Sequence, residues 1–346
     1  METYCERLTQ ELFKLQPVEV VALPGRSDGQ PPSVIALLLF PFTVLRRLLA
    51  LKDAPQFVHL GDMAIWPLAL MTLARFPRAR IVLSAHGTDV SYGARGGMRG
   101  NLYSAYLKAG ARMLSHATVI ANSRATRSRV KAAGWRRVAV VPLAADQIPL
   151  PSTQVRRHTI LFAGRLIKRK GCSWFVREVL PLCPDHRLLI AGTRWDPGEN
   201  AALEHPRVEF LGPQSQAELA RLYAEAGTVV VPNIEVESGE YEGFGLVAPE
   251  AANAGGVVLA SNHGGLIDAV IDGQTGFLLP SGDAKAWAEK ISEVTSWSEA
   301  KRADFKATSQ HRARDYYSWS RVALQTYAAY ELGEVESLDP TFEDMT

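Results

Sequence analysis

The sequence predicts an α/β protein of two domains, each a parallel sheet with helices on both faces. The chain has 346 residues, which is long for a single hydrophobic core. Short runs rich in Val and Ile alternate with helical segments, a pattern typical of a doubly wound parallel sheet. The alternation stops at Leu143–Arg157, a polar stretch with two prolines that indicates a linker, and then starts again. We therefore predict one domain over residues 1–147 and another over residues 148–316.

The first domain opens with an amphipathic helix, in which apolar residues recur at helical spacing at Tyr4, Leu8, Leu12 and Leu15. The strands predicted after it are rich in branched apolar residues and end in polar loops. These strands are Val18–Gly25, Gln56–Leu60, Arg80–Asp89, 116–123 and 137–146. The helices predicted between them are 34–45, 63–76, Asn101–Leu114 and Arg124–Ala133.

The second domain repeats the alternation from Thr159 onward. The strands predicted in it lie within Thr159–Gly171, 186–192, 207–212, 228–232, Gly256–Val270 and 272–280, and the last is expected to be hairpin-like. One helix predicted in it ends at Leu180, and two others cover 214–226 and Ala284–Thr295. A final amphipathic helix follows at 317–333. The tail 334–346 is acidic and poor in core-forming residues, and we expect it to be disordered.

Composition excludes several classes of protein. The chain is 47% hydrophobic and 21% charged, as soluble globular proteins are, and its net charge is +2. So small a charge predicts no strong field for nucleic acid, and we expect no nucleic-acid partner. The cysteines Cys5, Cys172 and Cys183 form no C-x-x-C motif and no zinc spacing, so they fit reduced thiols in a cytoplasm. We recognise no secretory signal, and a cytoplasmic location is the expectation.

The most apolar run is Val34–Leu45, which is too short to cross a bilayer and contains Pro41. Arg46 and Arg47 follow it directly. Two interpretations stay open. The run is either a basic, apolar helix that rests on a membrane surface, which would place the protein at the inner face of a membrane, or a helix that covers one face of a sheet.

The stretch Val230–Glu250 carries the clearest functional pattern. A short apolar strand breaks at Pro232 into an acidic loop, which turns through glycines into an Ala-rich helix start. The first N–H groups of a helix have no internal partner and point at whatever lies there. Those of Phe244, Gly245 and Leu246 are therefore expected to hold a phosphate.

Two carboxylates, Glu242 and Glu250, bracket this turn with seven residues between them. Glu242 sits at the mouth of the turn, and Glu250 lies two turns further on and roughly on the same helix face. The layout suits a ligand with a phosphate at one end and hydroxyls at the other. An ordinary helix start with capping acids is the alternative interpretation.

A basic loop, AGRLIKRKG at 163–171, follows a predicted strand and precedes a helix. In it Arg165 offers a planar, two-pronged set of donors and Lys170 a point charge, and the neighbouring N–H groups add to their field. Such a loop suits a diphosphate, although an ordinary basic surface loop has the same composition. Lys168 and Arg169 are expected to be solvated.

These motifs resemble those of the retaining glycosyltransferases of family 4, which have the two-domain fold called GT-B. The resemblance is carried by PNIEVESGEYEGFGLVAPEAANAG, by AGRL followed by KG, and by SAHGTD. It covers nearly the whole chain and is strongest over Thr159–Leu332. It implies two Rossmann-like domains that face a cleft, with the final helix at 317–333 crossing back to the first domain.

The resemblance also implies roles for individual residues. Arg165 and Lys170 would stabilise the leaving diphosphate of a nucleotide-sugar donor, and Glu250 would bind the ribose hydroxyls. Glu242 would lie near the transferred sugar, and His86 would contact it. Further donor-binding residues at strand ends and turns are expected to be Gly164, Gly192, Gly212, Gly264 and Asn122. Since the clamp is basic and no Asp-x-Asp is suitably placed, we expect neither a metal nor another cofactor.

The activity implied is that of a retaining hexosyltransferase, which moves a sugar from its nucleotide to a hydroxyl acceptor. The acceptor expected is a glycan or a lipid-linked intermediate of surface-polysaccharide synthesis. Family members usually open with a strand and a glycine-rich loop, and the resemblance implies that both are absent here. That absence supports one alternative, a non-catalytic or truncated GT-B partner protein. A nucleotide-sugar epimerase of similar architecture is the other alternative.

Overall fold

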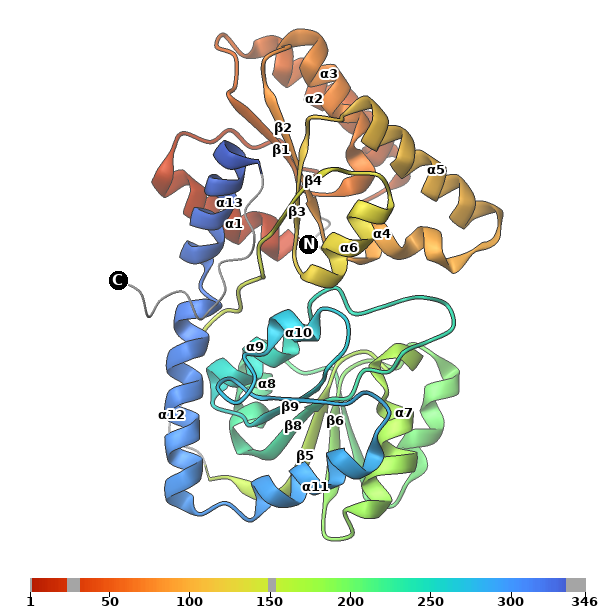
Figure 1. The fold of residues 1–346 in the computed structure, drawn as a ribbon, viewed down its shortest axis with the longest axis vertical. Coiled ribbons are helices and arrows are strands. Elements are labelled where there is room, and N and C mark those ends of the chain that lie inside the picture. Colours follow the sequence, from red (N-terminus) through yellow and green to blue (C-terminus); the bar gives the residue numbers. More distant parts are fainter. Residues whose placement is uncertain (1, 24–31, 149–153, 334–346) are drawn as a thin grey trace.

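The computed structural model describes residues 2–23, 32–148 and 154–333, whose strands form two parallel sheets (Figure 1). The first sheet, in the order β1-β2-β3-β4, consists of β1 (Phe57–Leu60), β2 (Arg80–Ala85), β3 (Thr118–Ala121) and β4 (Arg137–Val140). The second has the order β10-β9-β8-β5-β6-β7. Its strands are β5 (Arg156–Ala163), β6 (Arg187–Ala191), β7 (Val208–Gly212), β8 (Ala226–Val231), β9 (Val258–Ser261) and β10 (Phe277–Leu279). Every pairing is parallel, so the predicted α/β class with two doubly wound sheets is confirmed.

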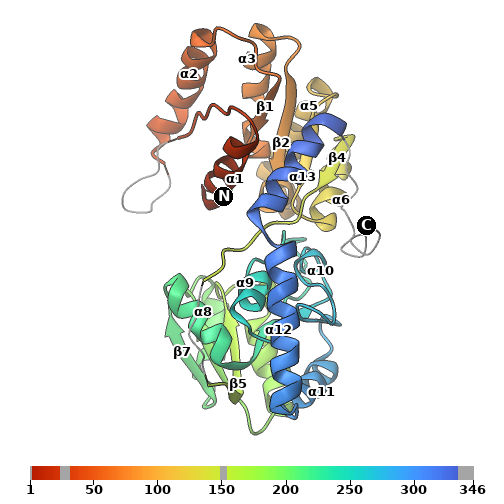
Figure 2. The ribbon, with the colours of Figure 1, turned by 90° about the vertical axis from the view of Figure 1, so that its left-hand side faces the viewer.

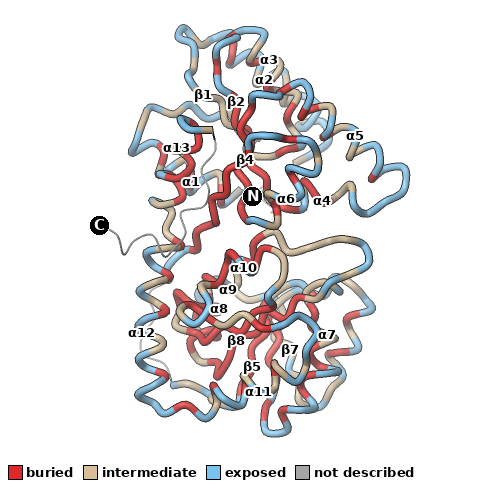
Figure 3. The backbone as a smooth tube through the Cα atoms, in the orientation of Figure 1, coloured by how far each residue is buried: buried red, intermediate tan, exposed pale blue. Residues whose placement is uncertain are grey.

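Helices flank both sheets, whose strands are the most deeply buried part of each half (Figure 3). In the first half they are α1 (Glu2–Leu15), α2 (Val34–Ala50), α3 (Pro67–Arg75), α4 (Thr88–Ser91), α5 (Gly97–Met113) and α6 (Arg124–Ala132). After the linker come α7 (Cys172–Trp174), α8 (Gln216–Glu225), α9 (Val247–Ala254), α10 (Leu266–Ala269), α11 (Ala284–Thr295), α12 (Glu299–Tyr316) and α13 (Trp319–Leu332). Several begin at a serine whose hydroxyl accepts an N–H of the first turn, and these caps are Ser33, Ser123, Ser215, Ser298 and Ser318.

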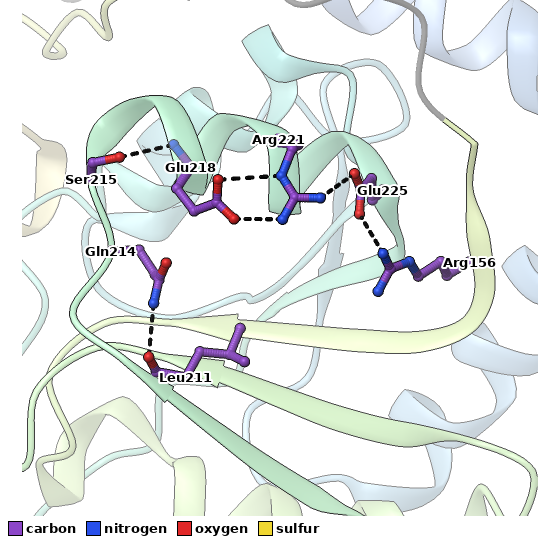
Figure 4. Close-up of polar contacts among 7 residues, drawn as sticks. All are labelled: Arg156, Leu211, Gln214, Ser215, Glu218, Arg221 and Glu225. Atoms are coloured by element: carbon purple, nitrogen blue, oxygen red, sulfur yellow. Dashed lines mark hydrogen bonds and ion pairs between the residues drawn. The ribbon is translucent and has the colours of Figure 1, made fainter.

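Helix α8 shows how local chemistry fixes such an element (Figure 4). The hydroxyl of Ser215 accepts the backbone N–H of Glu218 at 3.2 Å and starts the helix. Arg221 pairs with Glu218 one turn earlier and with Glu225 one turn later. Glu225 also pairs with Arg156 at the start of β5, at 3.2 Å. This row of charges ties α8 to an inner strand of the sheet, and α8 in turn packs against α9.

The last two helices lie on different halves of the molecule (Figures 1 and 2). Helix α12 runs along the second half and packs against α9, whereas α13 packs against α1 and β3 of the first half. Tyr317, at the junction, is fully buried. The indole N–H of Trp319 donates to Asp146 at 2.9 Å, and Arg321 donates to the carbonyl of Pro142 at 2.7 Å. The tail 334–346 lies outside the described residues.

Two predictions about elements are wrong, and one helix was missed. Residues 18–23 form no strand, and the rest of the strand predicted at Val18–Gly25 lies outside the described residues. Branched residues favour a strand only where a neighbouring strand supplies backbone partners, and within the described chain β1 pairs with β2 alone. The segment 272–280 contributes a strand parallel to β9 instead of a hairpin. Helix α12 was not predicted, because its exposed, highly charged sequence lacks a clear apolar stripe.

The apolar run predicted as a helix is part of α2, which continues through Pro41 to Ala50. This helix packs against α3, and the apolar cluster around its Leu48 also includes Val58 of β1. Among the described residues, no helix combines the length and the hydrophobicity that crossing a bilayer requires.

Candidate active site

Two loops from different halves of the molecule meet through their backbones. Gly87 follows β2 and has a φ of 106°, and a Cβ built on it would lie 2.7 Å from the Cα of Gly243. A Cβ on Gly243 would in turn lie 2.3 Å from the carbonyl oxygen of His86. The N–H of Gly265 donates to the carbonyl of Glu242 at 2.8 Å and braces the same turn from β9. The fold therefore brings the predicted residues His86 and Glu242 to adjacent positions.

Replacing Gly87 with alanine is expected to destabilise the protein by at least about 1 kcal/mol more than the same change at Gly96. Both glycines have positive φ, so alanine is strained at either position. Only Gly87 faces another backbone, since nothing lies within 4 Å of a Cβ built on Gly96. Thermal unfolding of the two variants measures the difference. Equal losses of stability would show that the contact with Gly243 is loose.

The Glu242 cluster, formed by Glu242, Arg169, Lys170 and Asn233, is the centre of the site. One carboxylate oxygen of Glu242 lies 2.7 Å from Arg169 Nη1, 2.5 Å from Lys170 Nζ and 3.1 Å from Asn233 Nδ2. The side chains of Glu242, Arg169 and Lys170 are only 11–13% exposed. Burial alone would raise the pKa of Glu242, but Lys170 and Arg169 outweigh it and lower that pKa to about 2.

The basic loop reaches Glu242 because it docks on the segment that follows β8. Gly171 has a left-handed backbone and lies so close to that segment that a Cβ on it would be 1.9 Å from the carbonyl oxygen of Pro232. The N–H of Ile234 donates to the carbonyl of Arg169 at 3.0 Å. Strands β5 and β8 are neighbours in the sheet, so the loops at their carboxyl ends meet at one edge, where ligands of such sheets bind.

The cations of the basic loop that contact Glu242 are only partly the ones that the sequence predicts. Lys170 contacts Glu242, but Arg165 is exposed and its guanidinium lies over the ring of Trp195, 5.4 Å from the ring centre. Lys168 is exposed, as predicted. The prediction that Arg169 is solvated is wrong, because the one-turn helix at 168–170 directs its side chain to the buried carboxylate. No pattern in the sequence distinguishes Arg169 from Lys168.

Asn233 was also missed, although it lies two residues beyond the end of β8 and the rule for parallel sheets could have found it. Glu250 lies in the first turn of α9 beside the phenol of Tyr223. Burial raises the pKa of Glu250 to about 7. The charge of Lys170 lowers the pKa of both Glu242 and Glu250, so this lysine lies near both predicted carboxylates.

His86 is held on three sides. Its backbone N–H donates to the carboxylate of Asp89, with distances of 2.9 and 3.1 Å to the two oxygens. Its ring Nε2 lies 2.9 Å from the carbonyl of Gly61, and the ring of Tyr4 packs edge-on at 4.8 Å. A carbonyl only accepts, so Nε2 carries the proton, and burial lowers the pKa of the imidazole. The neutral ring therefore keeps Nδ1 as an acceptor.

The remaining predicted residues support these loops. Asn122 is buried and donates to the carbonyl of His86 at 3.0 Å, so it holds the His86 loop rather than facing open solvent. Gly264 has a φ of 60° and faces the carbonyl of Glu242. The N–H of Gly164 donates to the last residue of β6, and the N–H of Gly192 donates to the carbonyl of Gly212 at 2.8 Å. Gly164, Gly192 and Gly212 therefore line up across the ends of β5, β6 and β7.

At the start of α9 the three predicted residues differ. Phe244 is buried and its ring packs edge-on against Tyr317 in the core. Gly245 has a φ of 94°, and Leu246 is exposed. Only their backbone N–H groups can therefore serve a ligand in the way the sequence suggests.

Comparisons with known proteins match both halves of the chain. A family model described as Glycosyl transferases group 1 matches residues 157–296, and one described as Glycosyltransferase Family 4 matches residues 1–147. The chain belongs to glycosyltransferase family 4. Each model covers one sheet and its helices, so the two halves of this family-4 chain are accounted for separately.

Curated relatives of this family-4 chain include two bacterial proteins named D-inositol 3-phosphate glycosyltransferase. The one from Corynebacterium diphtheriae is 31% identical over 198 residues, which are 53% of this chain and 44% of that protein. The one from Mycolicibacterium smegmatis is 34% identical over 195 residues, 52% of this chain and 41% of that protein. The matched region is thus less than half the length of these relatives.

Solved structures resemble the family-4 chain over nearly its whole length. Sucrose-phosphate synthase from Thermosynechococcus elongatus superimposes with a TM-score of 0.69 at 21% identity, and covers 95% of this chain and 92% of its own. Anabaena Alr3699/HepE, solved in complex with UDP-glucose, has a TM-score of 0.62 at 18% identity and covers 91% and 86%. At these identities the likeness shows the fold, which is GT-B.

Proposed function

We propose that this family-4 chain transfers a sugar from a nucleotide-diphosphate donor to a hydroxyl acceptor and retains the anomeric configuration. The observation that carries the proposal is the Glu242 cluster at the contact between the two halves. It joins a buried carboxylate to two cations, which suits a ligand with sugar hydroxyls beside a diphosphate. The names of the curated relatives support sugar transfer, and the neighbour solved with UDP-glucose supports a nucleotide-sugar donor.

In the proposed reaction the bond between the anomeric carbon and the leaving phosphate oxygen breaks while the acceptor oxygen bonds to the same face. The proton of the acceptor hydroxyl passes to that phosphate oxygen. Lys170 and Arg165 stabilise the charge that develops on the diphosphate, and the N–H groups at the start of α9 add to their field. These cations supply the charge that a metal would otherwise supply, so the reaction requires no metal or other cofactor.

Glu242, Glu250 and His86 bind the rest of the donor in this proposal. A diphosphate competes with Glu242 for Lys170, while Arg169 and Asn233 still hold the carboxylate beside the sugar. Glu242 then accepts sugar hydroxyls and stabilises positive charge at the anomeric carbon. Glu250 accepts hydrogen bonds from the ribose hydroxyls, and Nδ1 of His86 accepts a hydrogen bond from a hydroxyl of the transferred sugar.

The acceptor and the location are further parts of the proposal. The relatives' names favour a phosphorylated inositol as acceptor, whereas a lipid-linked or polysaccharide intermediate would suit the apolar surface of α2. A cytoplasmic location is supported by the cysteines, which are all free thiols, two of them buried.

Affinity for UDP is expected to rise with pH through about 7. Glu250 is protonated below that value because burial raises its pKa, and a carboxylate accepts two hydroxyls better than a carboxylic acid does. Below pH 7 the expected slope approaches tenfold per pH unit. Calorimetric titration of the wild type and Glu250→Gln measures it, and the variant should show weak, nearly pH-independent binding. A wild-type affinity that is flat over this range contradicts the role of Glu250.

Thermal shift with a panel of nucleotide sugars tests the proposed function. A donor present at about a hundred times its Kd stabilises the folded protein by about 2.7 kcal/mol. Transfer and hydrolysis of that donor are then compared between the wild type and Arg165→Ala, which should bind and transfer less. A folded wild type that binds no nucleotide sugar would favour a non-catalytic GT-B partner protein. Recovery of an epimerised nucleotide sugar would favour the epimerase.

A further inference from the structure

Helix α2 exposes apolar side chains on most of its surface. Val34 is 70% exposed, and Leu38 and Phe42 are each 68% exposed. The exposed apolar residues of α2 include Val34, Ile35, Leu38, Leu39, Phe42 and Leu49. Soluble proteins rarely leave so continuous an apolar patch in water unless something binds it.

Only one narrow side of α2 has a partner within the described chain. Leu48 is buried against Phe76 and Ala79, and Val44 and Leu51 pack beside them. Figure 2 shows α2 at the periphery, with no described element on its outer side. Packing against α3 therefore does not explain the apolar side chains on the outer side of α2.

The polar groups of α2 are confined to its last turns. From Val34 to Leu45 the only polar side chain is that of Thr43, whose hydroxyl donates to the carbonyl of Leu39 within the helix. A protein partner meets about ten hydrogen-bonding groups in a typical interface, and this surface offers none. A layer of acyl chains forms no hydrogen bonds, so contact with it requires no such groups.

The charges of α2 are all positive. The helix contains no acidic residue, and Arg46 and Arg47 are exposed near its C-terminal end. Arg47 pairs with Glu19, but both side chains stay more than a third exposed. An apolar surface that ends in two arginines is complementary to a bilayer with anionic headgroups.

We propose that the outer side of α2 lies in the surface of an anionic phospholipid bilayer. The side chains from Val34 to Leu45 enter the boundary between headgroups and acyl chains, and Arg46 and Arg47 contact the headgroup phosphates. At 17 residues, with two arginines near its end, the helix lies along the surface. The proposal involves no residue of the candidate active site, so it stands or falls independently of sugar transfer.

Co-sedimentation of the full chain with vesicles tests the proposal. Vesicles of phosphatidylcholine alone are compared with vesicles that also contain phosphatidylglycerol. The wild type should bind the second kind, and Leu38→Glu/Phe42→Glu should abolish binding because both substitutions place charge in the apolar layer. Arg46→Gln/Arg47→Gln should weaken binding to the anionic vesicles by roughly tenfold or more.

Leu102→Glu is the matched control, since Leu102 on α5 is 72% exposed on another helix and should not affect binding. Circular dichroism checks that every variant is folded, which is expected because all of the substituted side chains are exposed. A folded wild type that sediments with neither kind of vesicle overturns the proposal. Binding that survives Leu38→Glu/Phe42→Glu also overturns it. So does a wild-type dimer that binds no vesicle and that this double variant converts to monomers, because a second copy then covers α2.

Discussion

Replacing Lys170 with alanine is expected to lower kcat/KM by roughly a hundred- to a thousandfold, as loss of one charge-stabilising donor does in other enzymes. Lys170 contacts Glu242, and its charge lowers the pKa of both Glu242 and Glu250. In the proposed function these two carboxylates bind the sugar and the ribose, so the charge of Lys170 would lie beside the diphosphate that joins them. Steady-state kinetics with the donor found by the nucleotide-sugar panel measures the loss.

Lys168→Ala is the matched control, because Lys168 belongs to the same one-turn helix but is exposed. It should keep nearly the wild-type rate. Lys170→Arg should recover part of the activity, since it restores the charge with a different shape. Equal kinetics for Lys170→Ala and Lys168→Ala would mean that the ion pair with Glu242 is structural only.

Glu242→Gln is expected to lower both stability and kcat. The change leaves Arg169 and Lys170 facing each other in a nearly buried site without a compensating charge, which typically costs about 3–5 kcal/mol. The pKa of Glu242 is lowered to about 2, so its stabilising contribution is fully present above about pH 4.5 and is lost as the pH falls through about 2. The stability difference between wild type and variant should therefore shrink over that range.

Denaturant unfolding at neutral and acidic pH measures this difference, and single-turnover kinetics measures the chemical step. UDP should bind the variant at least as well as it binds the wild type, because Lys170 no longer has a competing carboxylate. Glu237→Gln is the control, since Glu237 is an exposed acid of the same loop. A variant as stable as this control at neutral pH would contradict the ion-pair account.

The sequence was sufficient for most of the fold because the strongest patterns are local. The branched runs at β5, β6 and β8 and the periodicity of α11 are complete within their own segments, and α11 has the predicted bounds Ala284–Thr295. The strand predicted at Val18–Gly25 does not form over its described residues 18–23 for the opposite reason, since a strand needs a partner that its own residues do not specify.

The site was less predictable, because its geometry depends on contacts between distant segments. Strand ends and glycine turns predicted that Glu242, Lys170 and His86 lie in loops that follow the carboxyl ends of strands, and the structure places them in such loops. No sequence rule states that Gly87 touches Gly243 through the backbone, or that Arg169 turns inward while Arg165 lies on Trp195. Those facts follow from how two loops dock, and single-residue patterns do not encode docking.

The path of the last two helices limits how hybrid enzymes can be built from this chain. In the part of the chain that the structure describes, the backbone leaves the first half after β4 and returns to it between Tyr316 and Trp319. A hybrid joined only at the linker would carry a foreign last helix onto α1 and would lose the 2.8 Å bond between His59 and the hydroxyl of Tyr330. Exchange of donor preference between related enzymes therefore calls for two junctions, with the native segment from Trp319 onward returned to its own lobe.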